Sequence, residues 1–171
     1  MKDIKDSIND ICYDLDYGVN CELDDDSKLL IAKTLQKLPL NIKDKIFSDK
    51  VNFLAINEKD ILHGRFQFIY FNNVIDKKEF TKFKNKDGFY YKEYKIPFIF
   101  LDFSRMKKMD DFTKMSIIAH EIAHFILKHD ISKESIKDNI LIFEKQADDL
   151  IEKWGFKRGY KEYNIKRVNK K

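Results

Sequence analysis

The sequence contains little glycine, proline or cysteine, and it has no long apolar run. Its 171 residues include only 5 glycines, 2 prolines and 2 cysteines. This scarcity excludes collagen-like and low-complexity chains, and two cysteines cannot form a disulfide framework or a four-cysteine zinc site. The longest apolar runs, such as residues 96–101, are far shorter than the ~20 residues that a transmembrane helix requires. We therefore expect a soluble globular protein with no membrane partner.

The two cysteines, Cys12 and Cys21, lie near the start of the chain, where no secretory signal is visible. Residues 1–16 contain five aspartates and no continuous apolar stretch. Because disulfides are rare in the cytosol, the simplest interpretation is a cytoplasmic protein with two reduced thiols. A bridge between the two cysteines is the alternative.

Apolar and aromatic residues are abundant: 43% of the chain is hydrophobic, and phenylalanine alone contributes 15 residues. A chain of this length can bury a sizeable core without a disulfide or a metal. We expect one domain over residues 1–156 and a basic tail over residues 157–171, which holds seven cations and one glutamate. A solvated terminus is the simpler interpretation of the tail. Docking onto nucleic acid or an acidic partner is the alternative.

The spacing of apolar residues changes from helical to alternating and back to helical along the chain. Helices are predicted over residues 1–15, 27–38, 42–47, 110–128 and 138–154, and strands over residues 51–56, 65–71 and 89–103. Pro97 indicates an edge position or a strand start within the last strand segment, and Gly155 follows the last helix as a C-terminal cap. This order predicts an α+β fold with N-terminal helices, a small, mostly antiparallel twisted sheet, and a C-terminal pair of helices.

The first helix of this pair contains the motif H-E-x-x-H, formed by His120, Glu121 and His124. Residues i and i+4 project from one face of a helix, so two imidazoles at this spacing can bind a single zinc ion. Glu121 is rotated by about 100° around the helix axis and can act as a general base toward an activated water molecule. The alternative is a pair of helix histidines satisfied by other hydrogen bonds.

A catalytic zinc ion normally has three protein ligands, and three residues are candidates for the third. Asp130 lies six residues after His124, where one class of zinc proteases has its third ligand. That class needs a helix-breaking glycine at the position that Leu127 occupies here, so Asp130 is disfavoured. His129 lies about 140° from His124 on a continuing helix, so we expect it to point elsewhere and to cap or end the helix. Glu144, on the next helix, is the better candidate.

Glu144 and Asp148 are four residues apart, so their carboxylates share one helix face. Two carboxylates in a helix–helix seam are costly without a cation or hydrogen-bond donors between them. We expect Glu144 to ligate the metal and Asp148 to accept a hydrogen bond from the outer N–H of a ligating histidine. The alternative is that both are ordinary solvated helix residues.

H-E-x-x-H followed by E-x-x-A-D at residues 144–148 resembles the gluzincin group of zinc metallopeptidases. The likeness covers about residues 113–156. In its small size and its lack of a visible secretory signal, the chain is most similar to the ImmA/IrrE-like cytoplasmic peptidases of phage and mobile elements. The E-x-x-A-D form is closer to Ste24/HtpX-like members, whose transmembrane helices are absent here. Ala123 stands where many members have glycine.

This resemblance implies a peptidase with one zinc ion, held by His120, His124 and Glu144, and with a protein or peptide as substrate. Glu121 would be the general base. We expect residues 97–103 to form an edge strand that pairs with the extended substrate. Candidates for stabilising the oxyanion are His63, Arg158, Tyr160 and Tyr163. The alternatives are a non-catalytic metal-binding regulator and a module that binds nucleic acid or an acidic partner through the tail.

Overall fold

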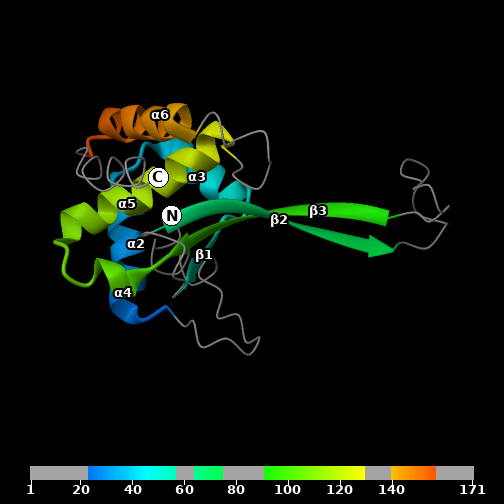
Figure 1. The fold of residues 1–171 in the computed structure, drawn as a ribbon, viewed down its shortest axis with the longest axis horizontal. Helices are drawn as coiled ribbons and strands as arrows, with labels where there is room; N and C mark the ends of the chain where they lie inside the picture. Colours follow the sequence, from blue (N-terminus) through cyan, green and yellow to red (C-terminus); the bar gives the residue numbers. More distant parts are fainter. Residues whose placement is uncertain (1–22, 57–63, 75–90, 130–139, 157–171) are drawn as a thin grey trace, which may run out of the picture.

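A computed structural model describes residues 23–56, 64–74, 91–129 and 140–156 of the chain. The predicted helix over residues 1–15, both cysteines and the basic tail lie outside these residues. In chain order, the described part has two helices, three strands and three further helices (Figure 1). This is the α+β order that the sequence predicts, and it confirms the predicted fold class.

The first two described helices begin and end close to where the sequence predicts. Helix α2 spans Asp25–Lys37, and the Asp24 side chain caps it by accepting a hydrogen bond from the Ser27 backbone N–H at 2.7 Å. Pro39 separates α2 from α3, which spans Leu40–Ser48. The apolar side of α2 is buried because Leu30, Ile31 and Leu35 belong to the main hydrophobic core.

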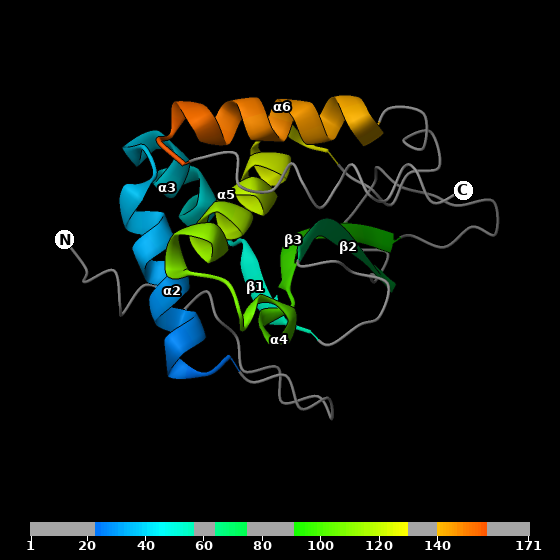
Figure 2. The ribbon, with the colours of Figure 1, turned by 60° about the vertical axis from the view of Figure 1, so that its left-hand side comes forward.

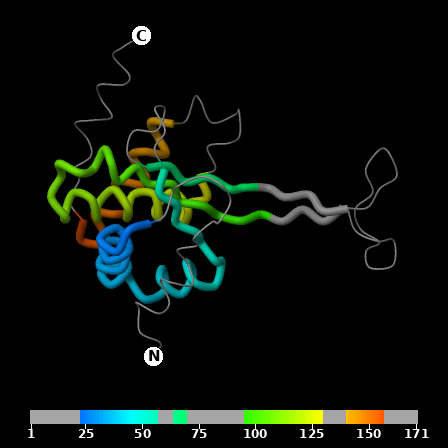
Figure 3. The backbone as a smooth tube through the Cα atoms, turned by 90° about the horizontal axis from the view of Figure 1, so that it is seen from below, coloured from blue at the N-terminus to red at the C-terminus, as the bar shows by residue number. Residues whose placement is uncertain are grey.

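The three strands form one mixed sheet in the order β1-β3-β2. Strand β1 spans Asn52–Ala55, β2 spans Gly64–Val74 and β3 spans Tyr91–Leu101. The long strands β2 and β3 are antiparallel, whereas the short β1 runs parallel to β3. Figures 1 and 3 show β2 and β3 extending together away from the helices.

Strand β3 is therefore central, and the expectation of an edge strand over residues 97–103 is wrong. Pro97 lies within β3 and faces Phe68 of β2, while pairing with β1 begins only at Phe98. The Pro97 carbonyl is contacted from the β1 side by the Asn52 side chain. The backbone nitrogen and carbonyl of one strand residue point to the same side of the strand, so the Pro97 nitrogen also faces β1. Its missing N–H therefore removes no hydrogen bond to β2.

Helix α5, spanning Asp111–Leu127, is at the centre of the described structure. It packs against α2, the last helix α6 (Ile140–Lys153), β2 and β3. Figure 2 shows α6 crossing over α5, with α2 and α3 to the left of α5. A short helix, α4 (Phe103–Met106), which the sequence pattern did not predict, connects β3 to the turn before α5. No helix in the described ranges is both long and apolar enough to cross a bilayer.

Candidate metal centre

The H-E-x-x-H motif lies in the most buried part of α5. Asp110 caps the helix through a 2.9 Å hydrogen bond from the Thr113 backbone N–H, close to the predicted start. Every residue from Met115 to Phe125 is buried. Isoleucines, alanines and Phe125 fill the faces toward the sheet and α2, which leaves the two motif histidines on the side toward α6.

Three side chains from α5 and α6 converge on one point. The Nε2 atoms of His120 and His124 are 3.0 Å apart, and Glu144 oxygens lie 3.1 Å from the first and 3.5 Å from the second. Zinc bonds of about 2.0–2.1 Å in a tetrahedral site place neighbouring donor atoms roughly 3.3–3.4 Å apart. The two Glu144 distances are to different oxygens, Oε2 and Oε1, and one ligand atom from each of the three residues lies within 4.8 Å of the others, so the group and its donor types fit one ion.

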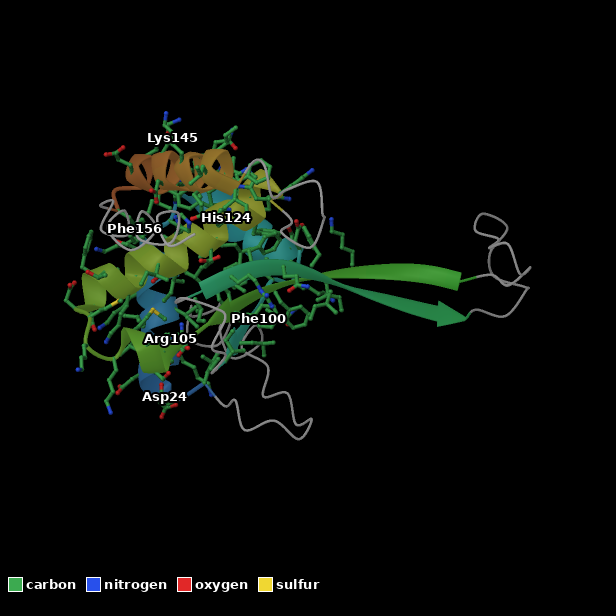
Figure 4. All side chains as sticks on the ribbon, in the orientation of Figure 1. Asp24, Phe100, Arg105, His124, Lys145 and Phe156 are labelled. Atoms are coloured by element: carbon green, nitrogen blue, oxygen red, sulfur yellow. The ribbon has the colours of Figure 1, made fainter. Side chains whose placement is uncertain are left out.

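Asp148 lies on the far side of the first histidine. Its Oδ1 atom is 3.1 Å from Nδ1 of His120, and both side chains are buried. A carboxylate accepts hydrogen bonds, so the proton of a neutral His120 belongs on Nδ1 and the lone pair of Nε2 faces Glu144. Lys145, in contrast, is exposed on the outer face of α6, on the opposite side from His124 (Figure 4).

His129 joins this group, contrary to the expectation that it points elsewhere. Helix α5 ends at Leu127, and Lys128 adopts a left-handed conformation with φ 59°. The chain reverses there, and the Lys128 and His129 N–H groups bond to the Phe125 and His124 carbonyls in a Schellman motif. The reversal brings Nδ1 of His129 to 3.0 Å from Nδ1 of His124, so the helical-wheel angle no longer applies.

Glu121 faces the sheet rather than α6. Its side chain is only 4% exposed, and the Phe66 backbone N–H of β2 hydrogen-bonds it. Gly64, the first residue of β2, lies so close that a Cβ atom there would be 2.8 Å from Cγ of Glu121. Burial raises the pKa of Glu121 above its usual range, opposed by the positive charges of His124 and His120 when they are protonated.

The electrostatics of the group favour a positive charge at its centre. Burial opposes charging of His120, but hydrogen bonds to Asp148 and Glu144 and the nearby carboxylates raise its pKa to about 10. Burial likewise opposes ionisation of Glu144, yet the two histidines hold its pKa well below the usual range. Without a metal, a proton on His120 supplies the positive charge. A divalent cation would supply it without that proton.

The candidate oxyanion residues His63, Arg158, Tyr160 and Tyr163, and the disfavoured ligand Asp130, lie outside the described residues. Among the described residues, sequence reasoning missed His129 as part of the site. The H-x-x-x-x-H spacing of His124 and His129 was visible, but no glycine marked the reversal between them.

No protein-family model, no curated protein and no solved structure matches this chain. The fold and the site therefore carry the assignment by themselves. They define an α+β protein with a His–His–Glu group, on two packed helices, that could hold one metal ion. This arrangement is consistent with a zincin-like site.

Proposed function

We propose that this protein is a zinc-dependent endopeptidase that hydrolyses peptide bonds of an intracellular protein. The observation that carries the proposal is the convergence of ligand atoms from His120, His124 and Glu144 to within 4.8 Å of one another, with the buried carboxylate of Glu121 next to His120 in the same helix. A purely structural zinc site normally has four protein ligands, whereas three ligands leave a position open for chemistry.

His120, His124 and Glu144 would hold the zinc ion. When bound there, zinc lowers the pKa of a water molecule toward ~7 and polarises a carbonyl group. Asp148 orients His120 by accepting the Nδ1 proton, which keeps the Nε2 lone pair directed into the site.

Glu121 is the candidate general base. It would take a proton from the attacking water and deliver it to the leaving amine, so it must be able to gain and lose that proton. Burial already raises the pKa of Glu121 toward the range where both steps are easy. The Phe66 N–H fixes the carboxylate against β2, which positions the base relative to the sheet.

Strand β2 replaces residues 97–103 as the candidate strand for substrate pairing. It pairs on one side with β3 and on the other side with no strand in the described part of the chain. The Phe66 N–H points to this outer side, toward Glu121, and Phe68 has the same orientation along the strand. An extended peptide added to this edge would pass the carboxylate of Glu121.

The experiment that tests the proposal measures zinc content and peptide cleavage together. We expect near-stoichiometric zinc in the wild-type protein and in Glu121→Gln, and a large loss of zinc in His124→Ala and Glu144→Ala. A library of peptides from a digested proteome, analysed by mass spectrometry, should show new zinc-dependent termini with the wild type only. The Lys145→Ala variant, on the outer face of α6, is the matched control and should behave as the wild type.

Two outcomes would overturn the peptidase assignment. Absence of zinc after reconstitution would remove the metal site altogether. Stoichiometric zinc with no cleavage of peptides or folded proteins, together with a biological function that survives Glu121→Gln, would instead establish a metal-binding regulator.

A further inference from the structure

His129 is a buried imidazole that the ligand set does not use. It is 5% exposed and lies directly after the left-handed residue that ends α5. Its ring stacks on Phe143 of α6, with the ring centroids 4.2 Å apart and the planes 19° from parallel. The Gln146 side chain also hydrogen-bonds the His129 ring. Two helices and a turn thus fix the orientation of this ring before any metal binds.

The contact between His129 and His124 has only one consistent protonation pattern when His124 binds a metal. The two Nδ1 atoms are 3.0 Å apart, so one must carry a proton and the other must accept it. A metal-binding Nε2 atom must be unprotonated, which places the proton of neutral His124 on Nδ1. Nδ1 of His129 is then the acceptor, and the proton of His129 moves to Nε2, where an amide oxygen such as that of Gln146 can accept it.

We propose that His129 is a positioning residue, which holds His124 in its metal-binding tautomer and orientation by accepting the Nδ1 proton. This proposal rests on the function proposed above for the same site. It gives each ligating histidine its own acceptor: Asp148 for His120 and His129 for His124. Metal-ligating histidines generally donate their second N–H to such an acceptor.

The choice of a neutral acceptor for His124 has an electrostatic reason. The carboxylates of Glu144 and Asp148 already balance the two charges of a zinc ion, and Glu121 adds a further carboxyl group, which is buried. Another carboxylate at position 129 would leave an uncompensated buried charge. An imidazole supplies the lone pair without the charge.

Two substitutions separate the hydrogen bond from the packing of the ring. His129→Phe keeps a planar ring against Phe143 but removes the nitrogen. His129→Asn loses the ring but keeps a polar atom on Cγ, at the position that Nδ1 occupies. Phe143→Leu is the matched control, because it removes the ring stack and leaves both histidines in place.

The measurement is the zinc dissociation constant of each folded variant, obtained by competition with a chromophoric chelator, with the visible spectrum of the Co²⁺ form as a second readout. We expect His129→Phe to weaken zinc binding about 10–100-fold and to alter the Co²⁺ spectrum, whereas His129→Asn and Phe143→Leu stay within about threefold of the wild type. If His129→Phe does not fold, His129→Leu serves as the variant without an acceptor.

Three results would overturn the proposal. Wild-type affinity in His129→Phe would show that His124 needs no acceptor, and it would leave the metal site and the peptidase assignment intact. Weak binding in His129→Asn and Phe143→Leu but not in His129→Phe would assign His129 a packing role only. A wild-type protein that binds no zinc would overturn this proposal and the proposed function together.

Discussion

The two glycines in the described part of the chain allow activity and stability to be perturbed separately. Gly64 has no left-handed backbone, but a Cβ atom there would lie 2.8 Å from Cγ and 3.0 Å from Oε1 of Glu121. Gly155 has φ +85°, and a Cβ atom there would meet nothing within 4 Å. Alanine at position 64 therefore displaces the proposed base, whereas alanine at position 155 only strains the backbone.

The sizes of both effects follow from these distances. Carbon atoms pack at about 3.5–4.0 Å, so the Gly64→Ala methyl group forces Glu121 to move by roughly 0.7–1.2 Å. A displacement of about 1 Å at a reacting group can cost on the order of 10²-fold in rate. Because the Glu121 side chain can rotate away, we expect little loss of stability. Gly155→Ala should cost about 1 kcal/mol for a left-handed alanine, which lowers Tm by roughly 2–4 °C.

The assay combines thermal unfolding, zinc content and kcat/KM on a peptide identified as a substrate. We expect Gly64→Ala to retain zinc and Tm but to lose about 10²-fold in kcat/KM. Gly155→Ala should retain kcat/KM at a temperature well below its lowered Tm. Unchanged kcat/KM in Gly64→Ala would refute the role of Glu121 as base. Loss of zinc in the same variant would refute the separation of base from ligands.

Three further predictions concern stability. Lys128→Gly should raise the free energy of unfolding by about 1 kcal/mol, because glycine adopts the left-handed conformation without strain. A lower free energy of unfolding in urea denaturation would contradict this. Asp24→Ala should lower it by about 1 kcal/mol near neutral pH. Hydrogen bonds from Ser27 lower the pKa of Asp24, so this difference should vanish as the pH falls through that lowered pKa, and a difference that persists in strong acid would contradict the capping role. Removal of zinc by a chelator should lower the free energy of unfolding by about 2.7 kcal/mol, or Tm by roughly 5–10 °C. The reference is the protein with free zinc at about 100 times the dissociation constant. An unchanged calorimetric Tm would show that no zinc is bound.

Local signals in the sequence predicted helices α2, α3, α5 and α6 and the three residues of the His–His–Glu group. Asp24 and Asp110 mark helix starts because their side chains accept N–H groups three residues later. Gly155 marks the end of α6 because its left-handed backbone suits glycine. The spacing of His120 and His124 and the carboxylates of α6 depend on the helical period alone, so their convergence needed only that the two helices pack together.

The features that the sequence did not predict depend on the backbone or on long-range pairing. Both α5 and α6 end in a Schellman motif, but α5 has Lys128 where α6 has Gly155. Without a glycine, nothing local indicated the reversal that brings His129 to His124. The strand order could not be predicted either, because alternation of apolar and polar residues identifies a strand but does not indicate which strands pair with it.

The division of the ligands between α5 and α6 also sets an order of events during protein synthesis. His120 leaves the ribosome 24 residues before Glu144. At about 5–20 residues per second, the complete histidine pair precedes its third ligand by roughly one to four seconds. During that interval the nascent chain offers two ligands, fewer than the three of a catalytic zinc site. Under the proposed function, the three-ligand site is therefore complete, and hydrolysis possible, only after α6 has been made and has docked on α5.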